Sequence, residues 1–309
     1  MKALVAIDGS ERSWESLRQI AALLAPERDQ VGLYYAPPSL QLRGKTGAPM
    51  DDVVERSREM LAEAVFSKAC EHLPVALRAS MHKVIGRQHQ PREGILIAAN
   101  QWPADLIVVG ARGAGPIQSL LLGSVSRWVV HHATIPVLVT RPRHDQGSDS
   151  AFKVLVACGD ISINESTRRL VNGLSWPART QGRLIHIVEQ SLLGEIPPWL
   201  EELARNSISE PRARALVEEF DAEMRQTKQA MLDASRELPP AFRQFPPIVE
   251  EGYAAERIHR VVTSEKIDLV VVGRRRVGAR ERLLLGSTSE KVLNFAHCSV
   301  LVVCEPELL

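Results

Sequence analysis

The chain has 309 residues, and its 45% hydrophobic and 24% charged residues are typical of a globular protein of about two domains. Its 38 Lys and Arg residues balance 37 Asp and Glu residues, so no long-range field draws it to nucleic acid or to an anionic membrane. No apolar run is long enough for a membrane span and the four cysteines lack metal-ligand spacing, so we expect a cytoplasmic protein.

The first predicted elements alternate between strand and helix. Residues 2–8 form an apolar run that predicts a buried strand rather than a signal peptide. Ser10 then stands at the expected start of a helix, in which Trp14 and Leu17 begin a helical apolar spacing. Further runs rich in Val, Ile and Leu, without strict alternation, are typical of parallel strands buried on both faces. They are predicted near 30–36, 80–85, 105–110 and 136–140.

A polar linker, residues 143–151, separates a first domain, 1–142, from a second domain, 152–309. The second domain shows the same succession of apolar runs. Its strands are predicted near 152–158, 182–188, 247–251, 268–273 and 299–303. Its extra length lies in 197–236, a charged region that predicts a long helix broken near Pro211.

Segments of the first domain recur in the second. The KALVA sequence at residues 2–6 returns as KVLVA at 153–157. Three later segments, DLIVVG, LLGS and PVLV, return at one constant spacing as DLVVVG, LLGS and SVLV, which begin at residues 268, 284 and 299. Such a repeat, with strands and helices alternating, predicts an α/β fold of two tandem, doubly wound, parallel five-stranded sheets of Rossmann-like type. Ligands bind such sheets beyond the carboxyl ends of the strands, where the strand order reverses.

The most informative segment follows the fourth strand of the first domain and reads GARGAGPIQSLLLGSVS from Gly110 onward. Gly110 and Gly113 allow a sharp turn and let a ligand approach the main chain. Gly123, Ser124 and Ser126 then stand at the start of the next helix, where free amide donors and the positive end of the helix dipole favour phosphate. Serine hydroxyls add donors of their own.

The pattern G-x2-G-x9-G-S in this segment resembles the ATP-binding motif of the universal stress protein family without a mismatch. The sequence VAIDGS at residues 5–10 is similar to the first strand of that family, and the resemblance covers nearly the whole chain in two copies. It implies an adenine nucleotide alpha hydrolase-like fold that binds ATP, accompanied by Mg²⁺ that protein side chains alone do not hold. The implied site consists of Asp8 and Ala36 at the adenosine, Gly110, Arg112 and Gly113 at the ribose and inner phosphates, and Gly123, Ser124, Val125 and Ser126 at the outer phosphates. The alternative is that the glycines only serve turns, as in members that bind no nucleotide.

The second domain departs from this pattern. Its loop begins GRRR where the motif has Gly-x2-Gly, and the position of Asp8 is taken by Gly159, with Asp160 one residue late. The GSTS sequence that follows is retained, so the phosphate end of the site can survive without the adenosine end. We therefore expect this domain to be empty or to bind only an anion, with help from Arg274; the alternative is that its arginines form a solvated surface run. The candidate anion site consists of Arg276, Gly286, Ser287 and Ser289.

These features predict a nucleotide-dependent regulator rather than an enzyme. No residue pair resembles a catalytic base with a positioned water, so we assign no catalytic residue. The stress-response role follows from the resemblance alone. Two alternatives stay open: a nucleotide-independent interaction protein, and a slow or self-phosphorylating ATPase with Ser124 or Ser126 as acceptor. We expect the two last strands to join the domains as an internal pseudo-dimer, with a homodimer through 197–236 and an unidentified protein partner as further expectations.

Two other motifs resemble functional sites, but their context does not support such a role. The sequence SLQLRGKT at residues 39–46 resembles a phosphate-binding loop, but it lacks the first glycine and follows the second strand rather than the first. It therefore predicts a mobile loop after the second strand. His131 and His132 are adjacent and cannot face one metal ion from a helix, so we expect them near the last helix carbonyls.

Overall fold

The computed structural model describes residues 1–38, 51–87, 90–111, 122–143, 150–189, 211–274 and 285–304, without the side chains of 51–52 and 211–216. We call residues 1–143 the N-terminal repeat and residues 150–304 the C-terminal repeat. The elements of the N-terminal repeat are β1 (Lys2–Ile7), α1 (Glu11–Ala21), β2 (Gln30–Tyr35), α2 (Asp51–Glu71), α3 (Val75–Arg78), β3 (His82–Ile85), α4 (Pro91–Gln101), β4 (Leu106–Gly110), α5 (Ser124–His132) and β5 (Val137–Thr140).

The C-terminal repeat follows the same plan with a longer helical region. Its elements are β6 (Phe152–Cys158), α6 (Glu165–Gly173), β7 (Thr180–Val188), α8 (Pro211–Ser235), the 3-10 turn η1 (Pro240–Phe242), β8 (Ile248–Glu251), α9 (Ala254–Ser264), β9 (Leu269–Arg274), α10 (Ser287–Phe295) and β10 (Ser299–Cys304). The long helix expected over 197–236 is present as α8, which begins at Pro211, and the part of that region before Pro211 lies outside the described residues.

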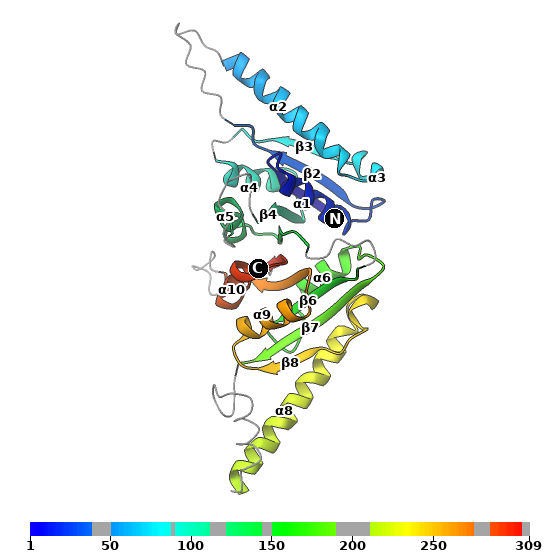
Figure 1. Cartoon of the computed structure of the whole chain (residues 1–309), viewed down its shortest axis with the longest axis vertical. Coiled ribbons are helices and arrows are strands. Elements are labelled where there is room, and N and C mark those ends of the chain that lie inside the picture. The colour runs from blue at the N-terminus through cyan, green and yellow to red at the C-terminus, as the bar shows by residue number, and fades with distance from the viewer. Residues whose placement is uncertain are drawn as a thin grey trace.

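The strands form one continuous sheet in the order β3-β2-β1-β4-β5-β10-β9-β6-β7-β8 (Figure 1). Neighbouring strands are parallel within each repeat, whereas β5 and β10 pair antiparallel, with Val139 opposite Val300 and Val137 opposite Val302. The two five-stranded units expected from the sequence are therefore present, and they meet through their last strands. This pairing satisfies the backbone groups of two apolar strands that would otherwise be exposed sheet edges.

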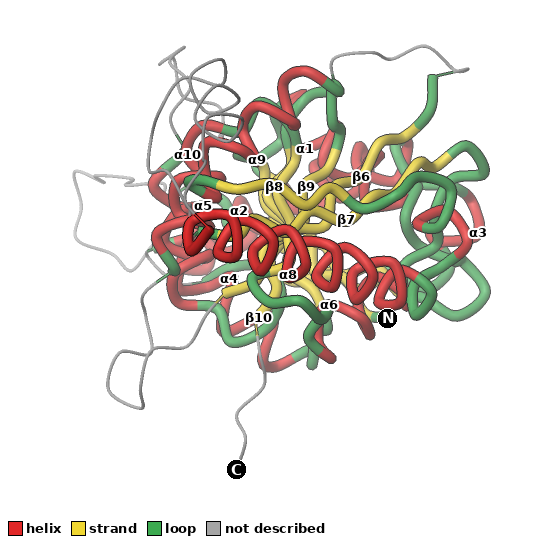
Figure 2. The backbone as a smooth tube through the Cα atoms, turned by 90° about the horizontal axis from the view of Figure 1, so that it is seen from below, coloured by secondary structure: helices red, strands yellow, loops and turns green. Residues whose placement is uncertain are grey.

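Helices cover both faces of the sheet (Figure 2). On one face, α1, α2, α6 and α8 pack through side chains that include the fully buried Leu17 and Met231. On the other face, α4, α5, α9 and α10 pack through side chains that include the fully buried Val129 and Val292. Strands enclosed on both faces have no polar side, which explains why they read as continuous apolar runs.

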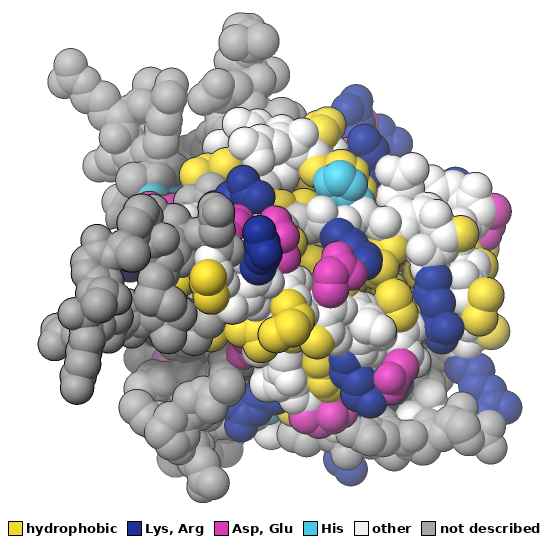
Figure 3. Space-filling view, turned by 90° about the horizontal axis from the view of Figure 1, so that it is seen from above, with side chains coloured by type: hydrophobic (Ala, Val, Ile, Leu, Met, Phe, Trp, Pro, Cys, Tyr) yellow, Lys and Arg dark blue, Asp and Glu magenta, His cyan; other side chains and the backbone are white. Residues whose placement is uncertain are grey.

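The surface carries charges of both signs. Figure 3 shows the end of the molecule that lies uppermost in Figure 1, where Lys and Arg side chains alternate with Asp and Glu side chains and with scattered hydrophobic ones. Among the large hydrophobic side chains, Met60 of α2 and Val75 of α3 are exposed, at 68% and 76%. None of the described helices combines the length and apolarity that crossing a bilayer requires.

The junction between the repeats is fixed by two buried arginines. Arg274 of the C-terminal repeat, 7% exposed, donates to the carbonyl oxygens of His131 (2.6 Å) and Ala133 (2.8 Å) at the end of α5. Arg141 of the N-terminal repeat, 9% exposed, donates to the carbonyl oxygen of Leu293 (2.6 Å) near the end of α10. Each repeat thus supplies a cation and hydrogen-bond donors to the carboxyl end of a helix in the other repeat.

Candidate functional site

The strand order of the N-terminal repeat reverses between β1 and β4. The chain passes from β1 to β2 on one side, whereas β4 pairs with β1 on its other side. Asp8 directly follows β1, Gly110 ends β4, and α5 begins at Ser124. Because the carboxyl ends of neighbouring parallel strands lie at one edge of a sheet, these residues meet at the position where doubly wound sheets bind ligands.

Asp8 is held in place by the turn that leads into α1. Its Oδ1 accepts hydrogen bonds from the Ser10 amide (3.0 Å) and the Ser10 hydroxyl (2.6 Å). Gly9 between them has φ 82°, a left-handed conformation that favours glycine. Ser10 also caps α1, because its Oγ accepts a hydrogen bond from the Ser13 amide (3.3 Å). The carboxylate therefore has a defined position while its residue remains exposed at the strand end.

The end of β2 forms an adjoining wall. Ala36 follows this strand and is half-buried against the core on the α4 and α5 face. Gly86, after β3, approaches it closely, because a Cβ placed on Gly86 would lie 3.0 Å from the Ala36 Cβ and 2.2 Å from the Tyr34 hydroxyl. That hydroxyl has no hydrogen-bond partner among the described residues, and burial raises the pKa of Tyr34 to about 12. Sequence reasoning did not identify Gly86 as part of this wall, and its only signal is a glycine directly after a predicted strand.

Helix α5 begins without a side-chain cap. Its N-cap residue is Gly123, with φ −63° and ψ 152°, and no described side chain accepts from the first amides of the helix. The amides of Ser124, Val125 and Ser126 have no acceptor within the helix, by the geometry of any helix start. The Gly123 amide itself donates to the Ala111 carbonyl (2.7 Å), which holds the helix start beside the end of β4. The arrangement leaves donors and a partial positive charge at the strand ends.

Ser126 has a more specific role than its hydroxyl chemistry predicts. Its side chain is buried, and its Oγ donates to the Gly110 carbonyl oxygen (2.6 Å). The hydroxyl proton is therefore used to tie α5 to β4, so that Ser126 offers a ligand its backbone amide rather than a free hydroxyl donor. The Ser124 side chain makes no such bond among the described residues and is exposed at the first helical position.

Two residues that the sequence assigned to the ribose and inner phosphates, Arg112 and Gly113, lie outside the described residues. The same holds for the loop at 39–46 and for Arg276 of the C-terminal repeat. The described part of the candidate site in the N-terminal repeat therefore consists of Asp8, Ala36, Gly110, Gly123, Ser124, Val125 and Ser126.

The C-terminal repeat keeps the helix start and changes the strand end. Gly286 caps α10 with φ −57° and ψ 148°, again without a side-chain bond, and the Ser289 Oγ donates to the Gly273 carbonyl oxygen (2.6 Å). At the end of β6, however, the Asn164 side chain caps α6 through the Thr167 amide (2.8 Å). The Asn164 amide nitrogen also lies 3.6 Å from the position of a Cβ on Gly273, so a polar side chain stands beside the end of β9.

Asp160 and Ser287 complete the description of this second strand end. The Asp160 Oδ1 accepts a hydrogen bond from the Ile161 amide (2.8 Å). The Asp160 carboxylate is therefore bonded to the next residue in the chain, whereas Asp8 is held by the amide and hydroxyl of Ser10, two residues later. Ser287 is the first residue of α10, equivalent to Ser124 of α5.

Arg274 does not belong to the expected anion site, nor is it a solvated surface residue. Its guanidinium is buried and directed to the carbonyl oxygens at the end of α5, as described above. Neither reading of the arginine run anticipated this position, because the carbonyl groups that accept its hydrogen bonds belong to a helix in the other repeat. Sequence spacing within one repeat contains no signal for such a contact.

His131 and His132 are the last residues of α5. As expected, His132 lies near a carbonyl of the last turn, with its Nδ1 2.8 Å from the Trp128 carbonyl oxygen. His131 instead faces the other repeat, with its Nε2 3.1 Å from Glu290 Oε2. Arg127 Nη1 lies 3.1 Å from Glu290 Oε1, so both side chains of α5 meet one carboxylate of α10. Among the described residues, no group of His, Cys, Asp and Glu side chains is arranged to hold a metal ion.

Comparisons with known proteins agree with this architecture. A model described as the universal stress protein family matches residues 1–141 and 199–303. A universal stress protein of Mycolicibacterium smegmatis is 25% identical over 97% of this chain and 96% of its own length. The universal stress protein Sll1388 of Synechocystis is 30% identical over 45% of this chain and 97% of its own length, as expected for a relative with one repeat. Among solved structures, a universal stress protein of Archaeoglobus fulgidus covers 99% of this chain and 97% of its own, with 19% identity and a TM-score of 0.55, which supports the fold.

Proposed function

The chain belongs to the universal stress protein family, and on that premise we propose that its N-terminal repeat binds ATP and that the bound nucleotide regulates a stress response. The proposal concerns a ligand that changes the state of a regulator, not a substrate that is turned over. The site is the edge formed by the ends of β1, β2 and β4 and the start of α5.

One observation carries the proposal: α5 begins at the reversal point of the sheet with a glycine cap and no capping side chain. A helix start needs acceptors for its first amides, and a triphosphate supplies them together with negative charge for the dipole. Natural helices commonly use Ser, Thr, Asp or Asn at this position, and this chain does so in α1 and α6. The contrast favours a site in which a ligand completes the helix.

The adenosine end of the proposed site is formed by different chemistry. Asp8 carries an acceptor that suits a ribose hydroxyl, and its position is fixed by Ser10. Ala36 presents a small apolar surface that suits the face of an adenine ring. When Mg²⁺ accompanies the nucleotide, the phosphates are expected to supply most of its ligands, because the described side chains offer no cluster for it.

The bonds of Ser126 bear on the alternative of self-phosphorylation. Its hydroxyl is buried and occupied with the Gly110 carbonyl, so it is a poor acceptor for a phosphoryl group. Ser124 is the better candidate if phosphoryl transfer occurs at all, yet no described side chain is positioned near it as a base. We therefore favour regulatory binding over a slow or self-phosphorylating ATPase.

In the C-terminal repeat we propose that no nucleotide binds and that the uncapped start of α10 accepts at most an anion through Gly286, Ser287 and Ser289. Gly159 removes the carboxylate that the adenosine end requires, and the Asn164 side chain stands beside Gly273. Arg276, which lies outside the described residues, stays a candidate for this anion site.

The sharpest test replaces the glycine cap itself. Gly123→Asp places a carboxylate where it can accept from the first amides of α5, so the helix should become more stable by about 0.5–1 kcal/mol while the phosphate site is both filled and negatively charged. We expect the Kd for ATP, measured by isothermal titration calorimetry, to rise at least about tenfold. Gly286→Asp is the matched control in α10, where the cap has nearly the same backbone angles.

The two outcomes separate folding from binding. If the proposal is right, both variants unfold at the same or a higher temperature, and only Gly123→Asp loses ATP. Unchanged ATP affinity in Gly123→Asp would remove the assignment of the phosphates to α5. Release of nucleotide from the denatured protein, followed by ion-exchange chromatography, distinguishes the functions: ATP supports regulation, ADP with turnover supports an ATPase, and no nucleotide supports an interaction protein.

A further inference from the structure

A cavity of about 260 Å³ lies where the two repeats meet, on the face of the sheet that α1 covers. The N-terminal repeat contributes the last turns of α1 and Leu138 of β5, and the C-terminal repeat contributes Phe152, Leu269 and Ser299 at the starts of β6, β9 and β10. We call it the junction cavity. It shares no lining residue with the proposed ATP site, so the two are separate features.

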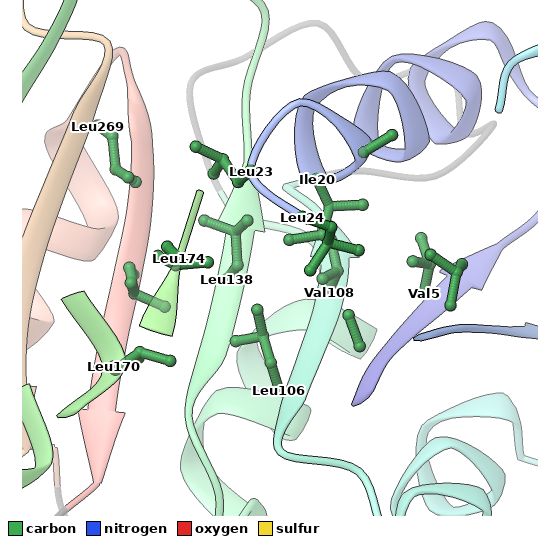
Figure 4. Close-up of a cluster of buried hydrophobic side chains, with 14 of the residues drawn as sticks. Val5, Ile20, Leu23, Leu24, Leu106, Val108, Leu138, Leu170, Leu174 and Leu269 are labelled. Atoms are coloured by element: carbon green, nitrogen blue, oxygen red, sulfur yellow. The ribbon is translucent and has the colours of Figure 1, made fainter. Parts of the chain in front are cut away.

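The floor of the junction cavity is apolar. Leu23, Leu138 and Leu269 line it and are 4%, 2% and 1% exposed. Figure 4 shows Leu23 close to Leu138, with Leu269 across the junction from them. Phe152 and Pro177 extend the apolar lining within the C-terminal repeat. Walls of this kind favour a ligand with an apolar body, since burying apolar surface is favourable.

Most polar groups around the cavity are already bonded to one another. The Gln19 Nε2 donates to the Arg141 carbonyl oxygen (2.7 Å), and the Ser299 hydroxyl donates to Gln19 Oε1 (2.9 Å). Arg143 Nε lies 3.0 Å from Oδ1 of Asp268, a carboxylate that is 8% exposed. These partners are buried or half-buried and fix the shape of the cavity, so they are poor candidates for exchanging a bond with a ligand.

Arg18 is the exposed cation of the lining, at 44%. Its Nη2 lies 2.8 Å from the carboxylate of Glu11, which is 76% exposed, and its Nη1 lies 3.0 Å from His72 Nδ1, so a ligand would have to compete only for the Glu11 side of the guanidinium. An ion pair between two exposed side chains contributes little, so a ligand carboxylate can replace Glu11 on Arg18 at small cost. Glu15 lines the same cavity one turn earlier on α1 and repels an anion, which restricts the approach to the Arg18 side.

We propose that the junction cavity binds a small amphipathic carboxylate, with its apolar part between Leu23, Leu138 and Leu269 and its carboxylate on Arg18. The volume suits a short acyl chain or a single aromatic ring and excludes a polymer. Because both repeats supply lining residues, the ligand contacts them simultaneously and stabilises the folded, joined form of the chain.

Octanoate is the probe, and octylammonium is its counterpart of opposite charge. Titration calorimetry on the full chain should show one saturable octanoate site, and the unfolding temperature should rise with octanoate concentration. Ala22→Trp fills the mouth of the cavity from an exposed lining position and should abolish the site. Arg18→Gln should weaken octanoate binding about fivefold or more, and octylammonium should bind at least about tenfold more weakly than octanoate.

Arg12→Gln is the matched control, because Arg12 is exposed on the same helix and does not line the cavity. It should leave octanoate binding unchanged. The proposal is overturned if octanoate shows no saturable binding, if Ala22→Trp binds it like the parent, or if octylammonium binds equally well. If Ala22→Trp unfolds, Ala22→Leu and the Arg18 and Arg12 pair still decide the question. Octanoate binding does not depend on ATP, so failure here leaves the proposed function standing.

Discussion

At the scale of single residues, the two repeats share one serine bond and differ in the side chains beside it. Ser126 and Ser289 each donate to the carbonyl oxygen that ends the preceding strand, at 2.6 Å in both repeats. That bond therefore holds helix to strand whether or not a nucleotide is expected. Asp8 distinguishes the repeats, because the C-terminal repeat has Gly159 at this position and places the Asn164 side chain beside its strand end.

Replacement of Asp8 follows from this difference. Asp8→Ala removes the acceptor expected at the ribose and also the two bonds from Ser10, so we expect the Kd for ATP to rise about tenfold, with a stability loss of about 1 kcal/mol. Asp160→Ala removes a carboxylate whose described hydrogen bond is to the neighbouring Ile161 amide, so this variant should leave ATP affinity unchanged. Calorimetric titration of both variants with ATP checks this. Equal losses in the two would show that both repeats bind nucleotide.

At the scale of elements, the strands were predicted from the sequence to within about two residues. The central strands are buried on both faces, and this burial imposes continuous apolar runs that a local pattern reveals, whereas the edge strands β3 and β8 are only partly buried. The start of α5 was also predicted, because glycine and serine motifs act through nearby backbone groups. The role of Arg274 and the junction cavity were not predicted, since both depend on contacts between residues more than a hundred positions apart.

Both ends of helix α5 have a role in the proposed arrangement. Its start lies at the proposed phosphate site, and its end is capped by Arg274 from the other repeat. Arg274, the last residue of β9 in the segment that lost the Gly-x2-Gly pattern, thus supports the helix at which we propose the N-terminal phosphate site. Arg141 does the same for α10 in the opposite direction. The divergence of the second motif therefore has a structural consequence for the first repeat.

Arg274→Met tests this support. Methionine has a similar length but leaves the His131 and Ala133 carbonyl oxygens without these donors, so we expect the free energy of unfolding to fall by about 2 kcal/mol. Urea unfolding followed by circular dichroism measures the change. Arg236→Met is the control, because that arginine is 71% exposed and pairs with Asp233 three residues earlier, and it should unfold like the parent. A stable Arg274→Met variant would show that α5 does not need the second repeat.

At the scale of the whole molecule, the repeats are joined by more than a covalent linker. The sheet passes through the β5–β10 pair, and each of the two hydrophobic clusters contains side chains from both repeats. The buried arginines and the pairing of Arg127 and His131 with Glu290 add polar contacts across the same boundary. A chain built this way should unfold as one cooperative unit.

Tryptophan probes in each repeat can detect whether it does. Trp128 lies on α5, and Trp176 packs against Phe242 in the C-terminal repeat. In two variants, each of which keeps only Trp128 or only Trp176 of the five tryptophans, we expect coincident urea transitions by fluorescence. ATP at about 100 times its Kd should raise the free energy of unfolding by about 2.7 kcal/mol for both probes, although we propose that it binds only the N-terminal repeat. A shift seen by the Trp128 probe alone would show that the repeats unfold independently, because a ligand stabilises only the unit that unfolds together with its site.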